Sequence, residues 1–271
     1  MTSRINRDTQ LCMSLSGRPG NFGTRFQNYL YEALGLNYVY KAFTTRDLPA
    51  AIGGIRALGI RGCAISMPFK EACIPLVDEI DTSAAAIESI NTIVNDDGHL
   101  RAYNTDYIAV ATLIEQHQVP PDITLALRGS GGMAKAVACA LRDAGFRHGH
   151  IVARNETAGR TLAEACGYAW SSDMQGVQAE LLINVTPIGM EGAEADTLAF
   201  SEQEVERARV VFDVVALPPE TPLIRLARAK GKSVITGAEV IVLQAVEQFV
   251  LYTGVRPDDA LIARAAAHAI G

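Results

Sequence analysis

An apolar run passes directly into a cluster of glycines in the stretch Leu125-Ala126-Leu127-Arg128-Gly129-Ser130-Gly131-Gly132-Met133-Ala134. The pattern predicts a buried strand over 124–127 and a helix over 133–144. Glycines permit a tight turn and let the backbone approach a pyrophosphate, whose charge the helix N-terminus stabilises. Plain turns also use glycine, but a strand before the cluster and a helix after it favour a dinucleotide site.

Strands and helices alternate on both sides of this stretch. Downstream, strands are predicted at 150–153, 181–185, 210–214 and 233–235, with a helix at 158–165. Upstream, a helix ended by Gly35, a strand at 37–43, a helix capped by Asp47 and a strand at 63–66 repeat the pattern. Further helices are predicted at 106–116 and 238–252. This order is typical of an α/β protein with mostly parallel sheets covered by helices.

The composition excludes several classes of protein. With 271 residues, 49% hydrophobic and 20% charged, the chain resembles ordinary soluble globular proteins. A net charge of −6 argues against nucleic acid binding, which needs a clustered cationic surface. The N-terminus is polar where a secretion signal would be apolar, and no apolar run has the length of a bilayer span. We therefore expect a cytoplasmic monomer or homodimer that binds a small molecule, with neither nucleic acid nor membrane as a partner.

Cysteine and histidine spacing gives no sign of a metal centre. The five cysteines include no Cys-x-x-Cys pair, so neither a zinc ribbon nor a disulfide framework is expected. His148 and His150 are close in sequence but have no carboxylate partner at ligand spacing. We expect no bound metal.

The end of the strand after the glycine loop distinguishes NAD from NADP. NAD sites usually carry an acidic residue about 20 positions past the loop, which holds the ribose hydroxyls. Here the strand ends in Ala153-Arg154-Asn155. A guanidinium at this place can bind a 2′-phosphate, so Arg154 favours NADP. Glu156 nearby leaves NAD open.

Polar residues are also predicted in loops that follow the apolar strands of the first part of the chain. They are Ser14 and Ser16, Ser66 and Lys70, Asn91, and Asp106. Loops at the carboxyl ends of parallel strands form the ligand crevice. Taken singly, Lys70 could be a solvated lysine and Asp106 a helix N-cap. Together, hydroxyls, an amide, an ammonium and a carboxylate suit a small polyhydroxylated acid.

With the glycine loop, these motifs resemble the shikimate dehydrogenase family over nearly the whole chain. Gln244 lies seven residues after Gly237, as in the family. The matching segments are Ser14-Leu15-Ser16, Ser66-Met67-Pro68-Phe69-Lys70-Glu71, Ile90-Asn91-Thr92, Asn104-Thr105-Asp106 and Asn184-Val185-Thr186-Pro187-Ile188-Gly189-Met190.

The resemblance implies reversible NADP-dependent hydride transfer between the C3 hydroxyl of shikimate and 3-dehydroshikimate, a reaction of the shikimate pathway of aromatic amino acid biosynthesis. It implies Lys70 and Asp106 as the catalytic pair. Alcohol oxidation requires removal of a proton as hydride leaves. A lysine can accept that proton near neutral pH only if its pKa is lowered or the proton is relayed, and partial burial would assist. Implied substrate-binding residues are Ser14, Ser16, Ser66, Asn91 and Gln244. Implied cofactor-binding residues are Gly129, Ser130, Gly131, Gly132, Met133, Ala134, Arg154, Thr186, Met190 and Gly237.

Some segments depart from the family pattern. The serine pair is followed by Gly17-Arg18-Pro19-Gly20-Asn21-Phe22-Gly23, a longer loop than the usual Ser-Pro step. Ala216 stands where a tyrosine is common, and Gly237-Ala238-Glu239-Val240 replaces a Gly-x-Gly-Met run. The pattern is that of a divergent member of the family, with weak activity on shikimate or a preference for a related compound.

Two alternatives stay open. The first is a quinate or other cyclic hydroxy-acid dehydrogenase that uses NAD or NADP. The second is a non-catalytic ligand-sensing module on the same fold, although a sensor needs no proton relay such as Lys70 and Asp106. A folate-type dehydrogenase would not explain Ser14 and Ser16.

The family fold has two α/β domains with a cleft between them. We expect residues 1–106 with 239–271 to form the substrate-binding and catalytic domain, with a mostly parallel sheet. Residues 107–238 would form a doubly wound, Rossmann-type NADP-binding domain.

Overall fold

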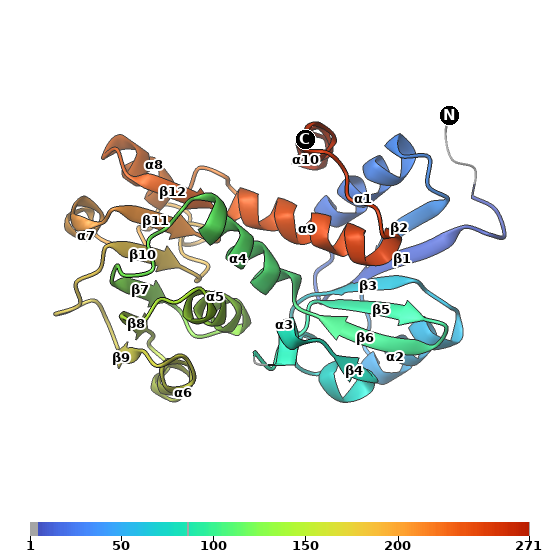
Figure 1. The fold of residues 1–271 in the computed structure, drawn as a ribbon, viewed down its shortest axis with the longest axis horizontal. Helices are drawn as coiled ribbons and strands as arrows, with labels where there is room; N and C mark the ends of the chain where they lie inside the picture. The colour runs from blue at the N-terminus through green and yellow to red at the C-terminus, as the bar shows by residue number, and fades with distance from the viewer. Residues whose placement is uncertain (1–4, 86, 271) are drawn as a thin grey trace. The chain divides into compact units, whose positions relative to one another are not determined.

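The computed structural model describes residues 5–85 and 87–270 (Figure 1). They divide into two compact units. The first unit combines the chain up to Thr105 with the chain from Val242 onward, and the second unit spans Asp106–Ile241. Each unit is built around its own sheet. None of the described helices is long and apolar enough to cross a membrane.

The first unit contains a mixed sheet with the strand order β2-β1-β3-β5-β6-β4. β1 pairs in parallel with β2 and β3, whereas β5 runs antiparallel to both β3 and β6. The strands are β1 (Gln10–Leu15), β2 (Tyr38–Phe43), β3 (Gly62–Ile65), β4 (Glu79–Ile80), β5 (Thr92–Asp96) and β6 (His99–Tyr103).

Sequence reasoning missed the β5–β6 hairpin. Its two-residue turn, Asp97 and Gly98, has φ values of 51° and 92°. Two central residues with positive φ are typical of the type I′ turn, and Asp-Gly is one of its preferred sequences. The signal was therefore present in the sequence, and the hairpin makes this sheet mixed.

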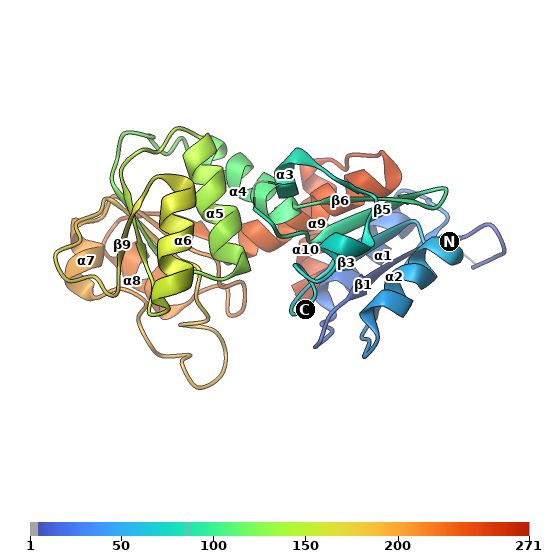
Figure 2. The ribbon, with the colours of Figure 1, turned by 90° about the horizontal axis from the view of Figure 1, so that it is seen from below.

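Helices cover both faces of the first sheet. Successive side chains of β1 point to opposite faces, so Cys12 joins one core cluster while Met13 and Leu15 join the other. The cluster around Cys12 includes residues of α1 (Phe22–Ala33), α9 (Gly237–Thr253) and α10 (Asp259–Ile270); the cluster around Met13 includes residues of α2 (Leu48–Ala57) (Figure 2). A 3₁₀ helix (Ile74–Leu76) and α3 (Thr82–Ala85) complete this unit.

The second unit is a parallel sheet with the strand order β12-β11-β10-β7-β8-β9. The order reverses between β7 and β10, as in the doubly wound dinucleotide fold. The strands are β7 (Leu125–Arg128), β8 (Gly149–Val152), β9 (Ala169–Ser171), β10 (Leu181–Asn184), β11 (Val210–Asp213) and β12 (Ser233–Thr236). The α/β prediction with a Rossmann-type unit is confirmed by this strand order.

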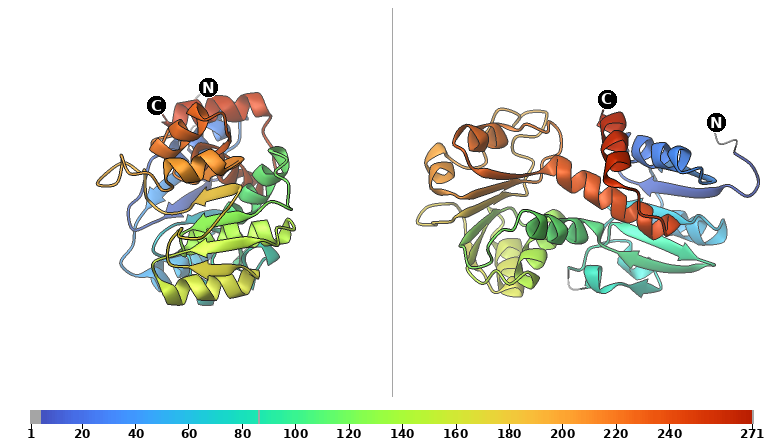
Figure 3. Two further views of the ribbon diagram at one scale, coloured as in Figure 1. Left: turned by 90° about the vertical axis from the view of Figure 1, so that its left-hand side faces the viewer. Right: turned by 45° about the horizontal axis from the view of Figure 1, so that its top comes forward.

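Helices pack on both faces of the second sheet (Figure 3). One face packs against α7 (Glu202–Arg207) and α8 (Pro222–Ala229), whose Val205, Leu223 and Ala227 are buried against strand residues. The helices that follow β7 and β8 are α5 (Gly132–Asp143) and α6 (Glu156–Cys166). α4 (Thr105–Gln116) begins at the boundary of the two units.

Candidate functional site

Residues from four strands meet at one edge of the first sheet. β5 runs antiparallel to β3, so the start of β5 lies beside the end of β3. The N–H of Ile65 donates to the carbonyl of Asn91 (2.7 Å), and the N–H of Asn91 donates to the carbonyl of Tyr103 (3.0 Å). The expectation that Asn91 follows a strand is therefore wrong: it precedes β5 and reaches this edge because that strand runs in the opposite direction. Ser14 also lies inside β1 rather than in the loop after it.

The Asn91 side chain is the centre of a buried polar network. Its Oδ1 accepts from the Thr105 N–H (2.8 Å), the Thr105 hydroxyl (3.0 Å) and the Thr92 hydroxyl (2.8 Å). Its Nδ2 donates to Oε1 of Gln244 on α9 (3.3 Å). Gln248, one turn further along α9, donates to the Thr92 hydroxyl (3.2 Å). These bonds fix the orientation of the Asn91 amide, and they bring Asn91 and Gln244 together as a pair.

Ile90 and Asn91 also hold two other parts of the main chain, one at Lys70 and one at Thr105, directly before Asp106. The N–H of Ile90 donates to the carbonyl of Lys70 (3.1 Å). On the other side, Asn91 holds Thr105, the residue directly before Asp106. Asp106 is buried in the first turn of α4, and Lys70 is half-buried. Segment 90–91 therefore positions the main chain of the proposed base and the residue adjoining the proposed aspartate.

The three serines differ in their surroundings. Ser14 is half-buried beside the phenol of Tyr40; burial raises the pKa of this tyrosine, and the neighbouring Ser14 hydroxyl opposes the rise. Ser16 is buried, and its Oγ accepts from the N–H of Arg18 (3.0 Å). Ser66 is exposed. Ser16 and Ser66 line one cavity of about 460 Å³ together with Gly17, Arg18, Met67 and Pro68.

Two glycines of the loop after β7 have different physical roles. Gly129 has a φ of +128°, and a Cβ there would lie 2.7 Å from Cγ2 of Val185, so the turn requires glycine. Gly131 is the N-cap of α5 with a φ of −84°. A Cβ on Gly131 would have no described atom within 4 Å, so the space in front of this helix start is open.

The start of α5 fits an anionic cofactor. The helix has no side-chain cap among the described residues, and the first-turn N–H groups, including those of Met133 and Ala134, have no intrahelical acceptor. The positive end of the helix dipole adds to the attraction of a phosphate. Ser130 and Gly132 are partly exposed beside it, and Ala134 is buried.

Two arginines lie at the same edge of the second sheet. Arg154 is exposed and follows β8, whose Val152 carbonyl accepts from the N–H of Gly129 (2.9 Å). Arg128, the last residue of β7, is half-buried with its guanidinium 5.2 Å from the ring centre of Phe200. Burial and the charge of Arg154 lower the pKa of Arg128. Sequence reasoning missed Arg128, although an arginine ending an apolar strand is a visible signal.

Asn184 and Asp213 hold the loop that carries Thr186 and Met190. The Asn184 Oδ1 accepts from the Thr186 hydroxyl (2.6 Å), and its Nδ2 donates to the Asp213 carboxylate (3.0 Å). Burial raises the pKa of Asp213. The hydrogen bonds that its carboxylate accepts, above all the one from Thr221, oppose this rise. Met190 itself is 45% exposed. Sequence reasoning did not identify Asn184 and Asp213 as the residues that position this loop, although each is a polar residue that ends an otherwise apolar strand.

Gly237 begins α9 directly beside the chain that follows β11. A Cβ at this position would overlap the main chain of Val214 and Val215. Glycine is therefore required for close packing of the helix start, independently of any cofactor contact.

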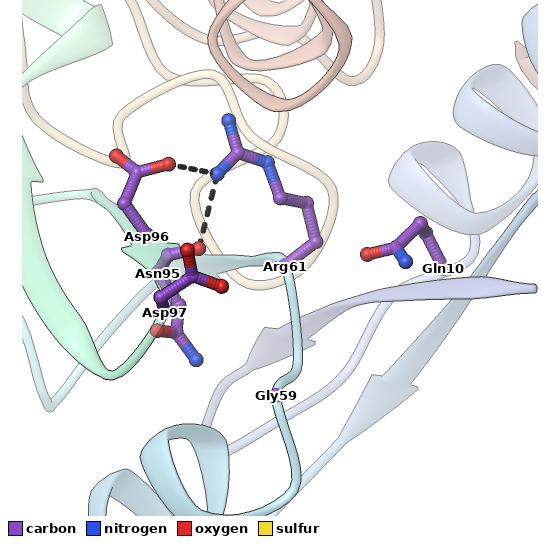
Figure 4. Close-up of a pocket in the computed structure, with 6 residues that line it drawn as sticks. All are labelled: Gln10, Gly59, Arg61, Asn95, Asp96 and Asp97. Atoms are coloured by element: carbon purple, nitrogen blue, oxygen red, sulfur yellow. Dashed lines mark hydrogen bonds and ion pairs between the residues drawn. The ribbon is translucent and has the colours of Figure 1, made fainter. Parts of the chain in front are cut away.

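A second cavity of the first unit lies near the starts of β1 and β3, at the strand ends away from Ser16 and Ser66 (Figure 4). It measures about 270 Å³ and is lined by Gln10, Gly59, Arg61, Asn95, Asp96 and Asp97. The Arg61 guanidinium already contacts the Asp96 carboxylate and the carbonyls of Asn95 and Tyr252. Its donors are therefore used to connect β3, β5 and α9.

A cavity of the second unit is also lined by groups with partners. It measures about 430 Å³ and contains Lys232, Arg209 and His117 among its lining residues. Lys232 donates to the carbonyl of Glu206 (2.6 Å), and Arg209 and His117 pair with Glu180 and Glu239. Over the described ranges 5–85 and 87–270, His, Cys, Asp and Glu form no group of three or more suited to a metal ion.

Comparison with known proteins identifies the family. Residues 22–93 match the shikimate dehydrogenase substrate binding domain. The chain is 60% identical to a shikimate dehydrogenase-like protein of Haemophilus influenzae over 98% of each chain. Its structure is similar to that of shikimate 5-dehydrogenase from Thermus thermophilus in complex with NADP(H) and shikimate (28% identity, TM-score 0.87, 96% of this chain and 100% of that chain). It is equally similar to quinate dehydrogenase from Corynebacterium glutamicum in complex with NAD (27%, TM-score 0.87, 97% and 99%). The chain belongs to the shikimate dehydrogenase family.

Proposed function

We propose that the protein is an NADP-dependent oxidoreductase that interconverts shikimate, or a closely related cyclic hydroxy acid, and its 3-keto form. The observation that carries the proposal is the pair of attachments made by segment 90–91. It bonds to the main chain of Lys70 on one side and to Thr105, the neighbour of Asp106, on the other. Such a support is what a proton-transferring pair requires to keep its geometry.

The proposed substrate-binding residues Asn91 and Gln244 can each donate an amide N–H to the substrate. Oδ1 of Asn91 is fully used by Thr92 and Thr105, so Nδ2 is the group that Asn91 can offer to a ring hydroxyl. The oxygen of Gln244 is used by Asn91, which leaves its amide nitrogen to donate. Ser14, Ser16 and Ser66 would bind the carboxylate. We assign this role to the unit that contains residues up to Thr105 and from Val242 onward.

In the proposed reaction, the hydroxyl proton passes to Lys70 as hydride leaves the ring carbon, and Asp106 orients the lysine and the substrate. Bound NADP supplies the hydride acceptor. Gly129, Ser130, Gly131 and Gly132 would cradle its pyrophosphate at the start of α5, and Arg154 with Arg128 would favour the 2′-phosphate. Thr186 and Met190, held by Asn184, would lie beside the nicotinamide, with Gly237 nearby.

A quinate dehydrogenase using NAD is the second candidate. The observation in its favour is the equal structural similarity to a quinate dehydrogenase solved with NAD.

The deciding experiment measures nucleotide reduction by absorbance with shikimate or quinate, each with NADP or NAD. We expect the highest kcat/KM for NADP with shikimate or a close relative. Higher kcat/KM for quinate with NAD would establish the second candidate. Tight binding of these acids without turnover would overturn the enzymatic proposal and support a sensor.

A variant pair tests the cofactor assignment. Arg154→Gln should lower kcat/KM with NADP by about tenfold and leave NAD kinetics unchanged, because a charge-assisted bond to the 2′-phosphate is lost. Arg147, exposed at the opposite end of β8, is the matched control as Arg147→Gln. An unchanged preference for NADP in Arg154→Gln would contradict the role of Arg154.

A further inference from the structure

The loop that departs from the family pattern contributes directly to the cavity at Ser16 and Ser66. Gly17 and Arg18, its first two residues, line this cavity of about 460 Å³ together with both serines, Met67 and Pro68. The start of this loop therefore brings an arginine to a cavity that also contains two hydroxyl groups.

Backbone bonds hold the start of this loop in place. The N–H of Ser16 donates to the carbonyl of Phe43 (3.2 Å), and the N–H of Gly17 donates to the carbonyl of Met67 (2.9 Å). The N–H of Arg18 then donates to Oγ of Ser16 (3.0 Å). A Cβ on Gly17 would lie 3.0 Å from Cδ of Pro68, so the two loops are in close contact. The Arg18 side chain is thus presented from an anchored backbone.

Arg18 carries a positive charge with no counter-ion from the described chain. It is exposed, and none of the ion pairs within residues 5–85 and 87–270 includes it. Arg56 and Arg101 of the same unit are paired, with Asp78 and Asp81, whereas the exposed Arg25 and Arg46 have no ion pair among the described residues and do not line this cavity. None of the six residues lining the cavity is acidic.

The hydroxyl of Ser16 is polarised in a direction that suits an anion. Because Oγ of Ser16 accepts from the N–H of Arg18, its own hydrogen is available to donate elsewhere. Ser66 provides a second hydroxyl on the same cavity. Two hydroxyl donors and a guanidinium with fork geometry match a carboxylate, which accepts through both oxygens.

We propose that Arg18 is a substrate-binding residue that pairs with a carboxylate in this cavity and makes the protein select cyclic hydroxy acids over neutral polyols. This inference rests on the proposed function and adds to it a specificity-determining residue at the site proposed for the carboxylate. The apolar side of the cavity, Pro68 and the 76% exposed Met67, would contact the ring.

Calorimetric titration with shikimate and with its uncharged methyl ester tests the inference. Both titrations are run with and without saturating NADPH, so that ordered binding does not hide the substrate site. Arg18→Gln should weaken shikimate binding by about tenfold and change ester binding by less than about twofold, because only the acid loses an ionic partner. Arg18→Lys should fall between wild type and Arg18→Gln, since it retains the charge without the fork.

Two further measurements separate charge from loop structure. Raising the salt concentration should weaken shikimate binding in the wild type more than in Arg18→Gln. Arg264 on α10, exposed and outside the six lining residues, is the control as Arg264→Gln, which should bind like the wild type.

The outcomes are distinguishable. Arg18→Gln binding shikimate within twofold of wild type overturns the role of Arg18 alone, as does an equal loss for acid and ester. Wild type that binds neither compound in either nucleotide condition overturns the proposed function together with this inference.

Discussion

Asn91 in the first unit and Gly129 in the second unit both lie at a sheet edge, but they position their neighbours by different means. Asn91 acts through its side chain, which holds Thr92, Thr105 and Gln244 by hydrogen bonds. Gly129 acts through its missing side chain, since its φ of +128° and the closeness of Val185 leave no room for a Cβ. One site depends on polar atoms, and the other depends on backbone shape.

This difference matches the ligand proposed for each unit. A polyhydroxylated acid presents donors and acceptors in fixed directions, which oriented amides and hydroxyls can recognise. A pyrophosphate is recognised by N–H groups at a helix start, which only a close backbone can supply. Substitutions in the first unit should therefore act through lost hydrogen bonds, and substitutions in the second unit through a changed backbone shape.

The largest expected effect tests whether the chemistry resides in the first unit. Lys70→Ala should lower kcat by about 10²- to 10⁴-fold, since a positioned proton acceptor is lost. NADP affinity, measured by fluorescence titration, should stay within about twofold. Lys70→Arg should be nearly as slow, because a guanidinium keeps the charge but does not deprotonate in proteins.

Lys232→Ala is the matched control, since this lysine bonds to the Glu206 carbonyl of the second unit. Near-normal turnover in Lys70→Ala would remove Lys70 from the mechanism.

The next effect separates two glycines of one loop. Gly129→Ala should destabilise the protein by about 2–4 kcal/mol, because alanine is strained at this φ and its Cβ meets Val185. Gly131→Ala should change stability by less than about 1 kcal/mol, since its φ is ordinary and its Cβ meets nothing.

Gly131→Ala, which should have little effect on stability, should have a clear effect on NADP binding. Gly131→Ala should weaken binding by about tenfold while the fold is kept, because the Cβ would occupy the approach to α5. Melting temperature and calorimetric affinity, measured on both variants, check this pattern. Equal melting temperatures for the two variants would contradict the distinction.

The side-chain network of the first unit should be sensitive at its centre and tolerant at its edge. Asn91→Ala should cost about 2–3 kcal/mol in the free energy of unfolding, because buried hydroxyl and N–H donors lose their acceptor. Gln244→Ala, which removes one bond from a half-buried side chain, should cost less than about 1 kcal/mol. Urea unfolding measures both, and equal losses would show that Asn91 is no hub.

Much of the fold was predictable because buried parallel strands are continuous apolar runs. Segments such as Leu181-Leu182-Ile183 and Val210-Val211-Phe212 show this directly. Caps marked the helices as well: Asp47 accepts from the N–H of Ala50 (3.0 Å) as expected. Gly35, with a φ of +65°, follows α1 as a helix-ending glycine should.

The missed features depend on contacts between distant parts of the sequence. Thr92 and Gln248 look like ordinary polar residues, and only packing of α9 against β5 shows their bond. Asn91 was placed after a strand because the direction of β5 is set by a hairpin that sequence reasoning overlooked. Asn184 and Asp213 end apolar strands, but their pairing requires β10 and β11 to be neighbours.

The smallest expected effect asks whether a side-chain network also supports the second unit. The Glu239 carboxylate accepts from the N–H and hydroxyl of Thr236 (both 2.7 Å) and pairs with His117 (2.9 Å). Burial raises the pKa of Glu239, but these bonds outweigh it and hold the pKa below its usual range. A depressed pKa in the folded state means that the stabilisation is present above the unfolded pKa and is lost as the pH falls through the folded value.

Glu239→Gln should therefore lower the free energy of unfolding by about 1 kcal/mol at pH 7, or about 2–4 °C in Tm. The difference from wild type should begin to shrink as the pH falls below the unfolded pKa of a glutamate, about 4.3, and should disappear below the lower folded pKa. Glu191→Gln, an exposed glutamate, serves as the control. A Tm difference for Glu239→Gln that stays constant from pH 7 to the acid limit would show that the charge of Glu239 does not stabilise the start of α9, leaving backbone shape as the main support of this unit.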